Sequence, residues 1–236
     1  MPLEPESGAP PLRAVEWLLV ERNRQRVRPG WAEERALWRA GYARVAGVDE
    51  VGRGPLAGPV VAAAVIMPVT PGGAAPRWAW IQQLRDSKQL SQTQREALAT
   101  EIRARCAWAV AAVSPQVVDQ INILRATRLA MHRAVDALPV RPDALIIDGR
   151  EVVDGGIEQR PVVGGDARCV SIAAASIVAK VARDRMMQEL DEVFPGYGLA
   201  INKGYATREH RDALTRLGYS SIHRLSFAPV REVVLR

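Results

Sequence analysis

Apolar and polar positions along the chain follow two periods, and each period predicts a different kind of element. Runs of β-branched and small apolar residues at 44–51 and 60–67, separated by a Gly/Pro turn, predict two buried strands. Shorter runs predict further strands at 108–113 and 144–147, and the second of these delivers Asp148. Helical spacing of apolar residues predicts helices over residues 91–105, 115–138, 171–190 and 207–217, the last being the final helix.

The N-terminal region differs from this pattern. Residues 1–12 hold four prolines and predict no regular structure, whereas residues 12–42 alternate apolar and charged positions as a helix does, with a break at Pro29 and Gly30. Early strands with interleaved helices and no internal repeat indicate the α/β class. We expect three regions: a partly helical N-terminal extension over 1–43, a core over 44–196 and a basic, helical C-terminal region over 197–236.

The composition is that of an ordinary globular chain. With 236 residues, 48% of them hydrophobic and 25% charged, it excludes disordered, collagen-like and disulfide-scaffold proteins. A chain of this length buries a sufficient core without a metal, so any metal would serve chemistry. The sequence shows neither a membrane-length apolar run nor a basic signal-peptide start, and Cys106 and Cys169 have no metal-ligand spacing. We therefore expect a cytoplasmic protein with no membrane partner.

The charge balance indicates a polyanionic partner. The formal net charge is +6, and residues 197–236 carry most of the surplus, with seven basic against three acidic residues. Of the 32 basic residues, 29 are arginines. Genome composition explains this bias as readily as a need for bidentate phosphate contacts does, and we favour composition.

Four acidic residues occupy positions where a carboxylate is costly. Asp49 and Glu50 end one apolar strand, Asp148 ends another, and Asp166 precedes a buried helix. Singly, each could be a capping or turn residue. Together, carboxylates at the ends of neighbouring strands would converge and repel unless a cation lay among them, and oxygen ligands without His or Cys suit Mg²⁺ or Mn²⁺. This set, with a polyanionic partner, predicts two-metal hydrolysis of a phosphodiester.

Adjacent Asp49 and Glu50 would point to opposite faces of a regular strand. We therefore expect at least one of them to lie at a bulge or at the strand end, so that both reach metal. The glycines of the next turn, Gly52 and Gly54, would allow either a ligand-binding nest of backbone amides or a simple strand connection.

These residues carry a resemblance to a known family. The stretch at 47–59, GVDEVGRGPLAGP, resembles the signature of ribonuclease HII, and later blocks match in the same order at 86–90, 147–149, 165–166, 172–180, 202–207 and 223–227. The resemblance covers about residues 44–230. It implies a ribonuclease H-like fold, with a central mixed β-sheet flanked by helices and a C-terminal helical region.

The resemblance also implies an activity. The family cleaves on the 5′ side of a ribonucleotide, in RNA/DNA hybrids and at single ribonucleotides in duplex DNA, leaving 3′-hydroxyl and 5′-phosphate ends, as in ribonucleotide excision repair. Its metal ligands would here be Asp49, Glu50, Asp148 and Asp166. Backbone groups of Gly52, Arg53 and Gly54 would read the ribose 2′-hydroxyl, and Tyr205 would stack on the neighbouring deoxyribose. Further candidates for substrate contact are Ser87, Lys88, Lys180 and Lys203.

Several plainer interpretations remain open. Tyr205 could be a packed tyrosine, and the spacing of Lys180 also allows a helix-surface ion pair with Asp184. For His210 and His223 a phosphate contact or a structural hydrogen bond is favoured over a role as general base. The chain departs from the family where Gly164 and Asn202 replace a frequent Lys and His.

Two rival functions are also open. The first is a related nuclease that prefers long RNA/DNA hybrids or branched DNA, against which the 52–54 turn and Tyr205 argue. The second is a nucleic-acid-binding module with a dead site, against which the presence of all four acids argues. A monomer is the default expectation.

Overall fold

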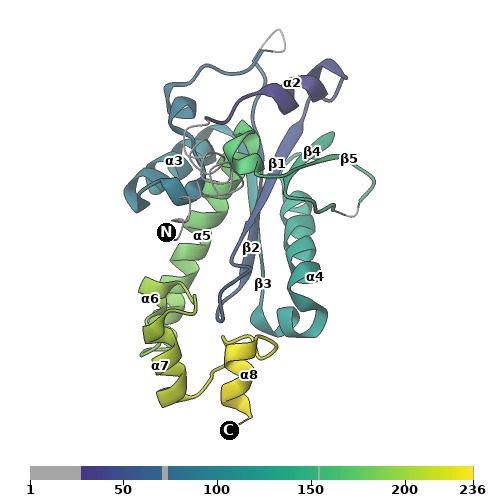
Figure 1. The fold of residues 1–236 in the computed structure, drawn as a ribbon. Helices are drawn as coiled ribbons and strands as arrows, with labels where there is room; N and C mark the ends of the chain where they lie inside the picture. The colour runs from purple at the N-terminus through teal and green to yellow at the C-terminus, as the bar shows by residue number, and fades with distance from the viewer. Residues whose placement is uncertain (1–27, 71–73, 154, 236) are drawn as a thin grey trace, which may run out of the picture.

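The computed structural model describes residues 28–70, 74–153 and 155–235. Five strands form one mixed sheet in the order β3-β2-β1-β4-β5 (Figure 1). Strand β1 is antiparallel to β2, β2 is antiparallel to β3, and β4 runs parallel to both β1 and β5. The strands are β1 (Val45–Val51), β2 (Val60–Ile66), β3 (Ala107–Val113), β4 (Ala144–Asp148) and β5 (Glu158–Val162). The parallel pair β1 and β4 therefore brings two carboxyl ends to one edge of the sheet.

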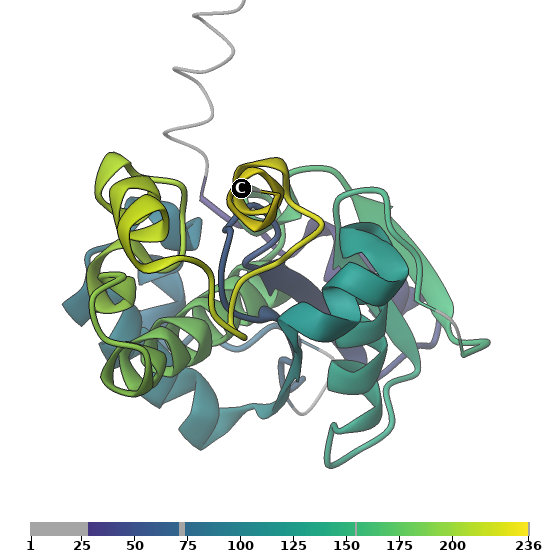
Figure 2. The ribbon, with the colours of Figure 1, turned by 90° about the horizontal axis from the view of Figure 1, so that it is seen from below.

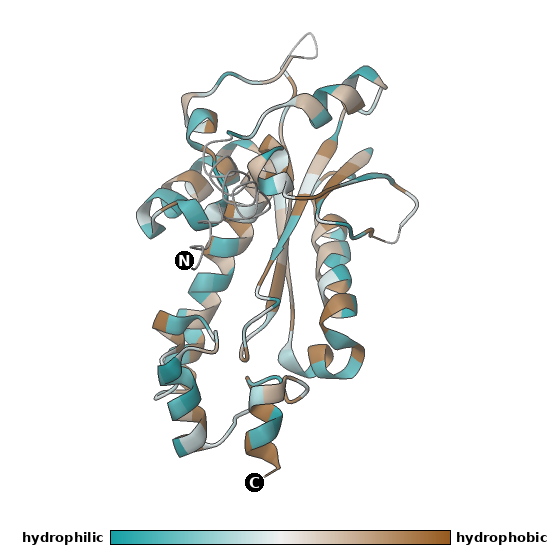
Figure 3. Cartoon of the chain, viewed as in Figure 1, coloured by the Kyte–Doolittle hydropathy of each residue, from teal (hydrophilic) through white to brown (hydrophobic). Residues whose placement is uncertain are grey.

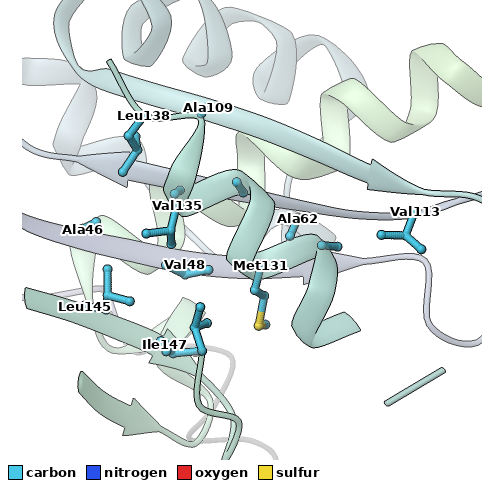
Figure 4. Packing of buried hydrophobic residues seen from close by; sticks show 14 of the residues in the cluster. Ala46, Val48, Ala62, Ala109, Val113, Met131, Val135, Leu138, Leu145 and Ile147 are labelled. Atoms are coloured by element: carbon cyan, nitrogen blue, oxygen red, sulfur yellow. The ribbon is translucent and has the colours of Figure 1, made fainter. Parts of the chain in front are cut away.

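Helices cover both faces of the sheet. Helix α5 (Val170–Val193) crosses one face with α3 (Gln92–Arg105) beside it, and α4 (Pro115–Asp136) covers the other, as Figure 1 shows. Val48 and Ala62 pack toward Met131 of α4 (Figure 4). Ala63 belongs to the cluster on the α5 face, because side chains alternate along a strand. Figure 3 shows hydrophobic residues concentrated on the strands between these layers.

Local sequence signals fix the ends of these helices. Ser91 and Gln94 form a reciprocal capping box at the start of α3. Ser114 caps α4, and Asn122 interrupts that helix with a φ of 67° while its side chain accepts hydrogen bonds from the next turn. The single helix predicted over 115–138 is therefore kinked. Three short 3₁₀ turns complete the core at Ala79–Gln83, Ser87–Gln89 and Gly165–Ala167.

The C-terminal helices pack against the far end of α5. They are α6 (Leu199–Asn202), α7 (Arg208–Leu217) and α8 (Ala228–Val234). Figure 2 shows α8 between α7 and α4. Buried Leu214 and Val230 join Leu56 and Met187 in one apolar cluster. This cluster fixes the C-terminal helices to the segment that follows β1.

One sequence expectation is wrong, and the sequence signals left one strand unpredicted. The helix at 207–217 is not the last, because α8 follows it. Helix α8 is too short for its periodicity to reveal it in the sequence, and the fully buried side chain of Val230 anchors it to the core. Strand β5 was not predicted, because its sequence, EQRPV, is polar and contains Pro161. A proline is tolerated there because β5 is an edge strand.

The described end of the N-terminal extension packs on the core. Helix α2 (Ala32–Arg39) buries Leu37 and Glu34 completely, and the Glu34 carboxylate accepts hydrogen bonds of 2.9 and 2.8 Å from the backbone and hydroxyl of Ser171. The part of the predicted helix that precedes residue 28 lies outside the described residues. Across the described ranges, no helix is both long enough and apolar enough to cross a membrane.

Candidate active site at the ends of β1 and β4

Asp49 and Glu50 lie in an unbroken antiparallel ladder. They pair with Ala63 and Ala62 of β2 in continuous register, so the expected bulge is absent at these positions. On the other side of β1, the pairing with β4 ends at Val48, which leaves both acids beyond the last parallel pair. The alternative expectation, a position at the strand end, is therefore the one that describes them.

Asp148 is the shared neighbour of the other three acids. Its charge contributes to the raised pKa of Asp49, of Glu50 and of Asp166, so all four carboxylates interact through it. It ends β4, and its Oδ1 accepts a hydrogen bond of 2.6 Å from the backbone N–H of Gly165. The parallel pairing of β1 with β4 is thus what brings these acids together.

Asp49 is the most deeply buried of the four, at 5% exposure. Burial raises its pKa well above the ordinary value, and the charges of Glu50 and Asp148 raise it further. The nearby hydroxyl of Ser176 on α5 opposes this shift, and it lies 2.9 Å from the hydroxyl of Ser87. Ser87, predicted to contact phosphate, is therefore buried and paired with a hydroxyl that lies near Asp49.

Asp166 lies in the 3₁₀ turn before α5. Burial, with the charges of Asp86 and Asp148, raises its pKa to about 6, and Lys88 opposes the shift. Partial burial lowers the pKa of Lys88, but the carboxylates of Asp86, Asp166 and Asp49 outweigh it and the net shift is upward. Exposed Lys88 is thus a cation at the mouth of the acidic site.

Glu50 pairs with the arginine of the following turn. Its Oε1 lies 3.2 Å from Nη1 of Arg53. Burial raises the pKa of Glu50, and this guanidinium counteracts the rise. The acidic site and the turn at 52–54 are therefore in direct contact.

The donor set fits a hard divalent cation. All four side chains offer carboxylate oxygens and their like charges are only partly neutralised, which is the chemistry of Mg²⁺ or Mn²⁺ sites. In the described part of the chain, however, no three or more His, Cys, Asp or Glu side chains are grouped closely enough to hold a metal ion. The acids converge electrostatically without forming a closed coordination shell.

The two glycines of the turn at 52–54, hereafter the first turn, differ in their surroundings. Gly52 has a φ of +89°, and a Cβ there would lie 2.2 Å from Nε of Arg183, so the fold itself requires glycine. Gly54 is exposed, and a Cβ there would meet only the ring of Tyr205, at 3.8 Å. Arg53 and Gly54 donate no backbone hydrogen bond within the described residues. Their amides therefore remain available to a ligand.

The turn at 203–205, hereafter the second turn, brings Tyr205 to the first. Gly204 accepts a 2.8 Å hydrogen bond from the Leu56 amide and donates one to the side chain of Asn202. The Tyr205 carbonyl accepts a hydrogen bond from Nδ1 of His210 at 2.9 Å. Tyr205 is 44% exposed, so it is not enclosed by the fold and part of it is open to solvent.

The two remaining lysines surround Asp184. Lys180 lies 2.6 Å from its carboxylate, so the ion pair that the spacing allows is present. Lys203 has a φ of 53°, and its Nζ lies 3.4 Å from the Asp184 carbonyl. Burial lowers the pKa of Lys203, as do the charges of Lys180 and Arg183. The structure thus groups these lysines with one another around α5.

Sequence reasoning missed two arginines at the site. Arg183 and Arg224 are both fully buried and hydrogen-bond to backbone carbonyls of the two turns. One signal was present: Arg224 lies in the block at 223–227 that carries the resemblance. Arg224 also accounts for one positive charge of the basic C-terminal region, and that charge points inward.

The fold and site together define a ribonuclease H-like phosphodiester hydrolase. The sequence profile described as Ribonuclease HII matches residues 46–230. The chain belongs to the ribonuclease HII family, and it is therefore an endoribonuclease of the ribonuclease H type. Both the resemblance and the predicted enzyme class are confirmed.

Close relatives carry the same name. Ribonuclease HII of Moorella thermoacetica is 55% identical over 206 residues, which cover 87% of this chain and 96% of the relative. Ribonuclease HII of Desulfitobacterium hafniense is 48% identical over 221 residues, covering 92% and 81%. The similarity therefore extends over most of this chain and of each relative.

Solved structures confirm the fold class. Ribonuclease H2 from Pyrococcus horikoshii OT3 superposes with a TM-score of 0.67 at 24% identity, covering 80% of this chain and 96% of that one. The PCNA:RNase HII complex from Archaeoglobus fulgidus gives 0.64 at 29% identity, covering 78% and 95%. Bst-RNase HIII in complex with Mn²⁺ gives 0.63 at 23% identity, covering 82% and 70%.

Proposed function

We propose that the chain is a metal-dependent endonuclease that hydrolyses the phosphodiester on the 5′ side of a ribonucleotide. Its substrates are RNA/DNA hybrids and single ribonucleotides embedded in duplex DNA, and its products carry 3′-hydroxyl and 5′-phosphate ends. The observation that carries the proposal is the contact between the acidic site and the first turn, over which the ring of Tyr205 lies. We further propose that it acts as a monomer in the cytoplasm, in ribonucleotide excision repair.

The four carboxylates are proposed to hold the metal. Asp49, Glu50, Asp148 and Asp166 supply only hard oxygen donors, and Asp148 interacts with each of the others. Divalent cations bound there would lower the pKa of the attacking water and stabilise the leaving 3′ oxygen. Asp49 is kept in place by the Glu50 amide at 2.7 Å, so its orientation is set before any ligand arrives.

The first turn is proposed to read the ribose. The unused amides of Arg53 and Gly54 are donors with which a 2′-hydroxyl oxygen could pair, and both residues are exposed. Because Gly54 has no side chain, a sugar could approach the backbone closely. Tyr205 lies beside this position and presents its ring to the sugar on the neighbouring nucleotide.

Exposed Lys88 is proposed to bind a phosphate next to the acids. Its charge partly neutralises Asp166 and would attract a phosphate once the carboxylates are occupied by cations. Lys180 and Lys203 would add positive charge farther along α5, and Ser87 would act through Ser176 and Asp49. These contacts would hold the scissile phosphate in line with the attacking water.

The deciding experiment compares three duplexes. One is all DNA, one contains a single ribonucleotide and one is an RNA/DNA hybrid, each incubated with the protein and Mg²⁺ or Mn²⁺. We expect both ribonucleotide-containing duplexes to be cut on the 5′ side of a ribonucleotide, with 3′-hydroxyl ends, and the DNA duplex to stay intact. Chelation with EDTA should stop both reactions.

Each other outcome supports a rival. Cleavage of the hybrid alone would favour a nuclease for long hybrids. Binding of all three duplexes without metal-dependent cleavage would indicate a binding module. Cutting of plain DNA would contradict the proposed role of the first turn.

A further inference from the structure

Two arginines beneath the two turns are completely buried without an ion pair. Arg183 belongs to α5 and Arg224 follows α7, and the exposed fraction of each is 0%. Neither forms an ion pair with a carboxylate of the described residues. Burying a charged guanidinium is costly unless its N–H groups donate hydrogen bonds. The acceptors of those hydrogen bonds therefore show which part of the fold each arginine holds in place.

Arg224 holds the first turn. Its Nη2 donates to the carbonyl of Gly52 at 2.6 Å, and its Nη1 donates to that of Arg53 at 2.9 Å. Nη2 also donates to the carbonyl of Gly58 at 2.9 Å. Burial lowers the pKa of Arg224 to about 9, so the group stays protonated and keeps all its donors at neutral pH. The planar fork therefore fixes both peptide groups that flank Arg53.

Arg183 holds the second turn. Its Nη1 donates to the carbonyl of Lys203 at 3.0 Å. Its other donors reach the carbonyls of Pro59, at 3.0 Å, and Ala57, at 3.3 Å. The guanidinium also fills the space beside Gly52, where no Cβ would fit. Arg183 therefore contacts both turns at once.

The two guanidiniums share one anchor. Three consecutive carbonyls, of residues 57–59, accept hydrogen bonds from them. Arg183 donates to the first and the third, and Arg224 donates to the second. This segment leads directly into β2, which pairs with the strand that carries Asp49. Through the two arginines, both turns are therefore held to the start of β2, the strand that pairs with the strand of the acidic site.

We propose that Arg183 and Arg224 are positioning residues that fix the first turn against the second, and thereby set the substrate preference of the site. This inference rests on the proposed function. Arg224 orients the amides that meet the 2′-hydroxyl, and Arg183 sets the place of Tyr205 relative to them. Selection of a ribose followed by a deoxyribose depends on the spacing of the two turns.

Arg224→Lys tests the first half. Lysine keeps the charge but cannot span three carbonyls. The measurement is the ratio of kcat/KM for a duplex with one ribonucleotide to that for the same duplex with 2′-fluoro in place of the 2′-hydroxyl. We expect this ratio to fall about tenfold, because a displaced turn loses its hydroxyl contact. A fraction of inactive protein lowers both rates equally and leaves the ratio unchanged.

Arg183→Lys tests the second half. Here the measurement is the ratio of kcat/KM for the single-ribonucleotide duplex to that for the RNA/DNA hybrid. We expect this ratio to fall about tenfold, because Tyr205 no longer faces the neighbouring deoxyribose correctly. If either lysine variant does not fold, Arg183→Gln or Arg224→Gln, which retains a neutral amide donor, is measured instead.

Val230→Ala is the matched control. It removes buried methyl groups from the same C-terminal cluster and touches no hydrogen bond to either turn, so both ratios should stay at the wild-type value despite a lower melting temperature. Wild-type ratios in both arginine variants would overturn the inference, as would equal changes in Val230→Ala. Failure of the wild-type enzyme to cut the single-ribonucleotide duplex would overturn the proposed function, and this inference with it.

Discussion

The acidic site and the two turns beside it differ in the sign of their buried charge and in whether the fold neutralises or hydrogen-bonds it. Burial raises the pKa of both Asp49 and Asp166. The charges of Glu50 and Asp148 raise that of Asp49 further, and the charges of Asp86 and Asp148 raise that of Asp166. The turns rest on Arg183 and Arg224, whose charges are buried yet hydrogen-bonded to carbonyl oxygens. The acidic site holds negative charge that its own residues only partly neutralise. In the two turns, the positive charges of the arginines are hydrogen-bonded to carbonyl groups of the fold.

This difference separates what a ligand supplies from what the fold supplies. The carboxylates repel one another and a bound cation would relieve that repulsion, so removing one of them should not cost stability. The turns are held by hydrogen bonds within the fold, so changes there should act through their shape and through those hydrogen bonds. Substitutions in the two regions should therefore differ in which property they alter, activity or stability.

The largest expected effect is that of Asp148→Asn. Asp148 interacts with all three other acids, so its loss should lower the cleavage rate by more than about 100-fold. Residues that only support a metal ligand cost up to about 100-fold when they are lost, and a ligand itself should cost more. The melting temperature in EDTA should stay equal or rise, because the amide removes a like charge and still accepts from Gly165. Duplex binding should persist. Normal cleavage, or a marked loss of stability, would break the comparison.

The next effect separates the two glycines of the first turn. Gly54→Ala should lower cleavage by about 100-fold at unchanged stability, because a methyl group would displace the sugar by about 1 Å and meets no protein atom closer than 3.8 Å. Gly52→Ala should instead lower the free energy of unfolding by about 1–2 kcal/mol or more, through its positive φ and the contact with Arg183. Urea denaturation and initial rates measure both. Equal behaviour of the two variants would contradict their assignment.

Strands β1 to β4, and the positions of the four acids relative to them, could be predicted because their signals are local. A run such as 44–51 is apolar until it ends in Asp49 and Glu50, so one short window shows both the strand and its chemistry. The resemblance then added the first turn and Tyr205. Neither the local sequence pattern nor the resemblance required knowledge of contacts between residues that are distant in sequence.

The supports of the turns could not be predicted, because their partners are distant in sequence. The acceptors of Arg183 at Ala57 and Pro59 are 126 and 124 residues away, and Gly58 is 166 residues from Arg224. In sequence each is one of 29 arginines, with nothing to mark it as buried. Helix α8 escaped notice for the same reason, because Val230 is buried only by residues that the chain's topology brings to it.

A smaller effect is expected from Tyr205→Ala. Loss of the ring should lower cleavage of the single-ribonucleotide duplex by about tenfold, the lower range for loss of an aromatic stacking contact, and should affect the hybrid less. Tyr205→Phe is the matched control, since it keeps the ring and should retain the preference. Equal losses on both substrates in Tyr205→Ala would remove the junction-reading role and leave the ring as an ordinary surface residue.

The smallest effect concerns the support of the second turn in acid. His210 and His223 face each other, Nε2 to Nε2, at 3.1 Å. The amide of Ser220 donates to Nδ1 of His223, so His223 must donate from Nε2 to His210, which in turn donates from Nδ1 to the Tyr205 carbonyl. This chain of donors requires both imidazoles to be neutral. Burial lowers both pKa values, that of His223 to about 4.

In the unfolded chain both histidines titrate near pH 6.5. Between pH 6.5 and 4 the unfolded chain therefore binds protons that the folded chain does not, and stability falls as the pH falls. Allowing for partial solvent screening, we expect the pair to lower the free energy of unfolding by about 1 kcal/mol at pH 5 relative to pH 7. Urea denaturation at both pH values measures this, with His223→Gln as the comparison, because the buried acids act in the opposite direction in both proteins. An identical pH dependence in wild type and variant would show that the second turn does not rely on neutral histidines.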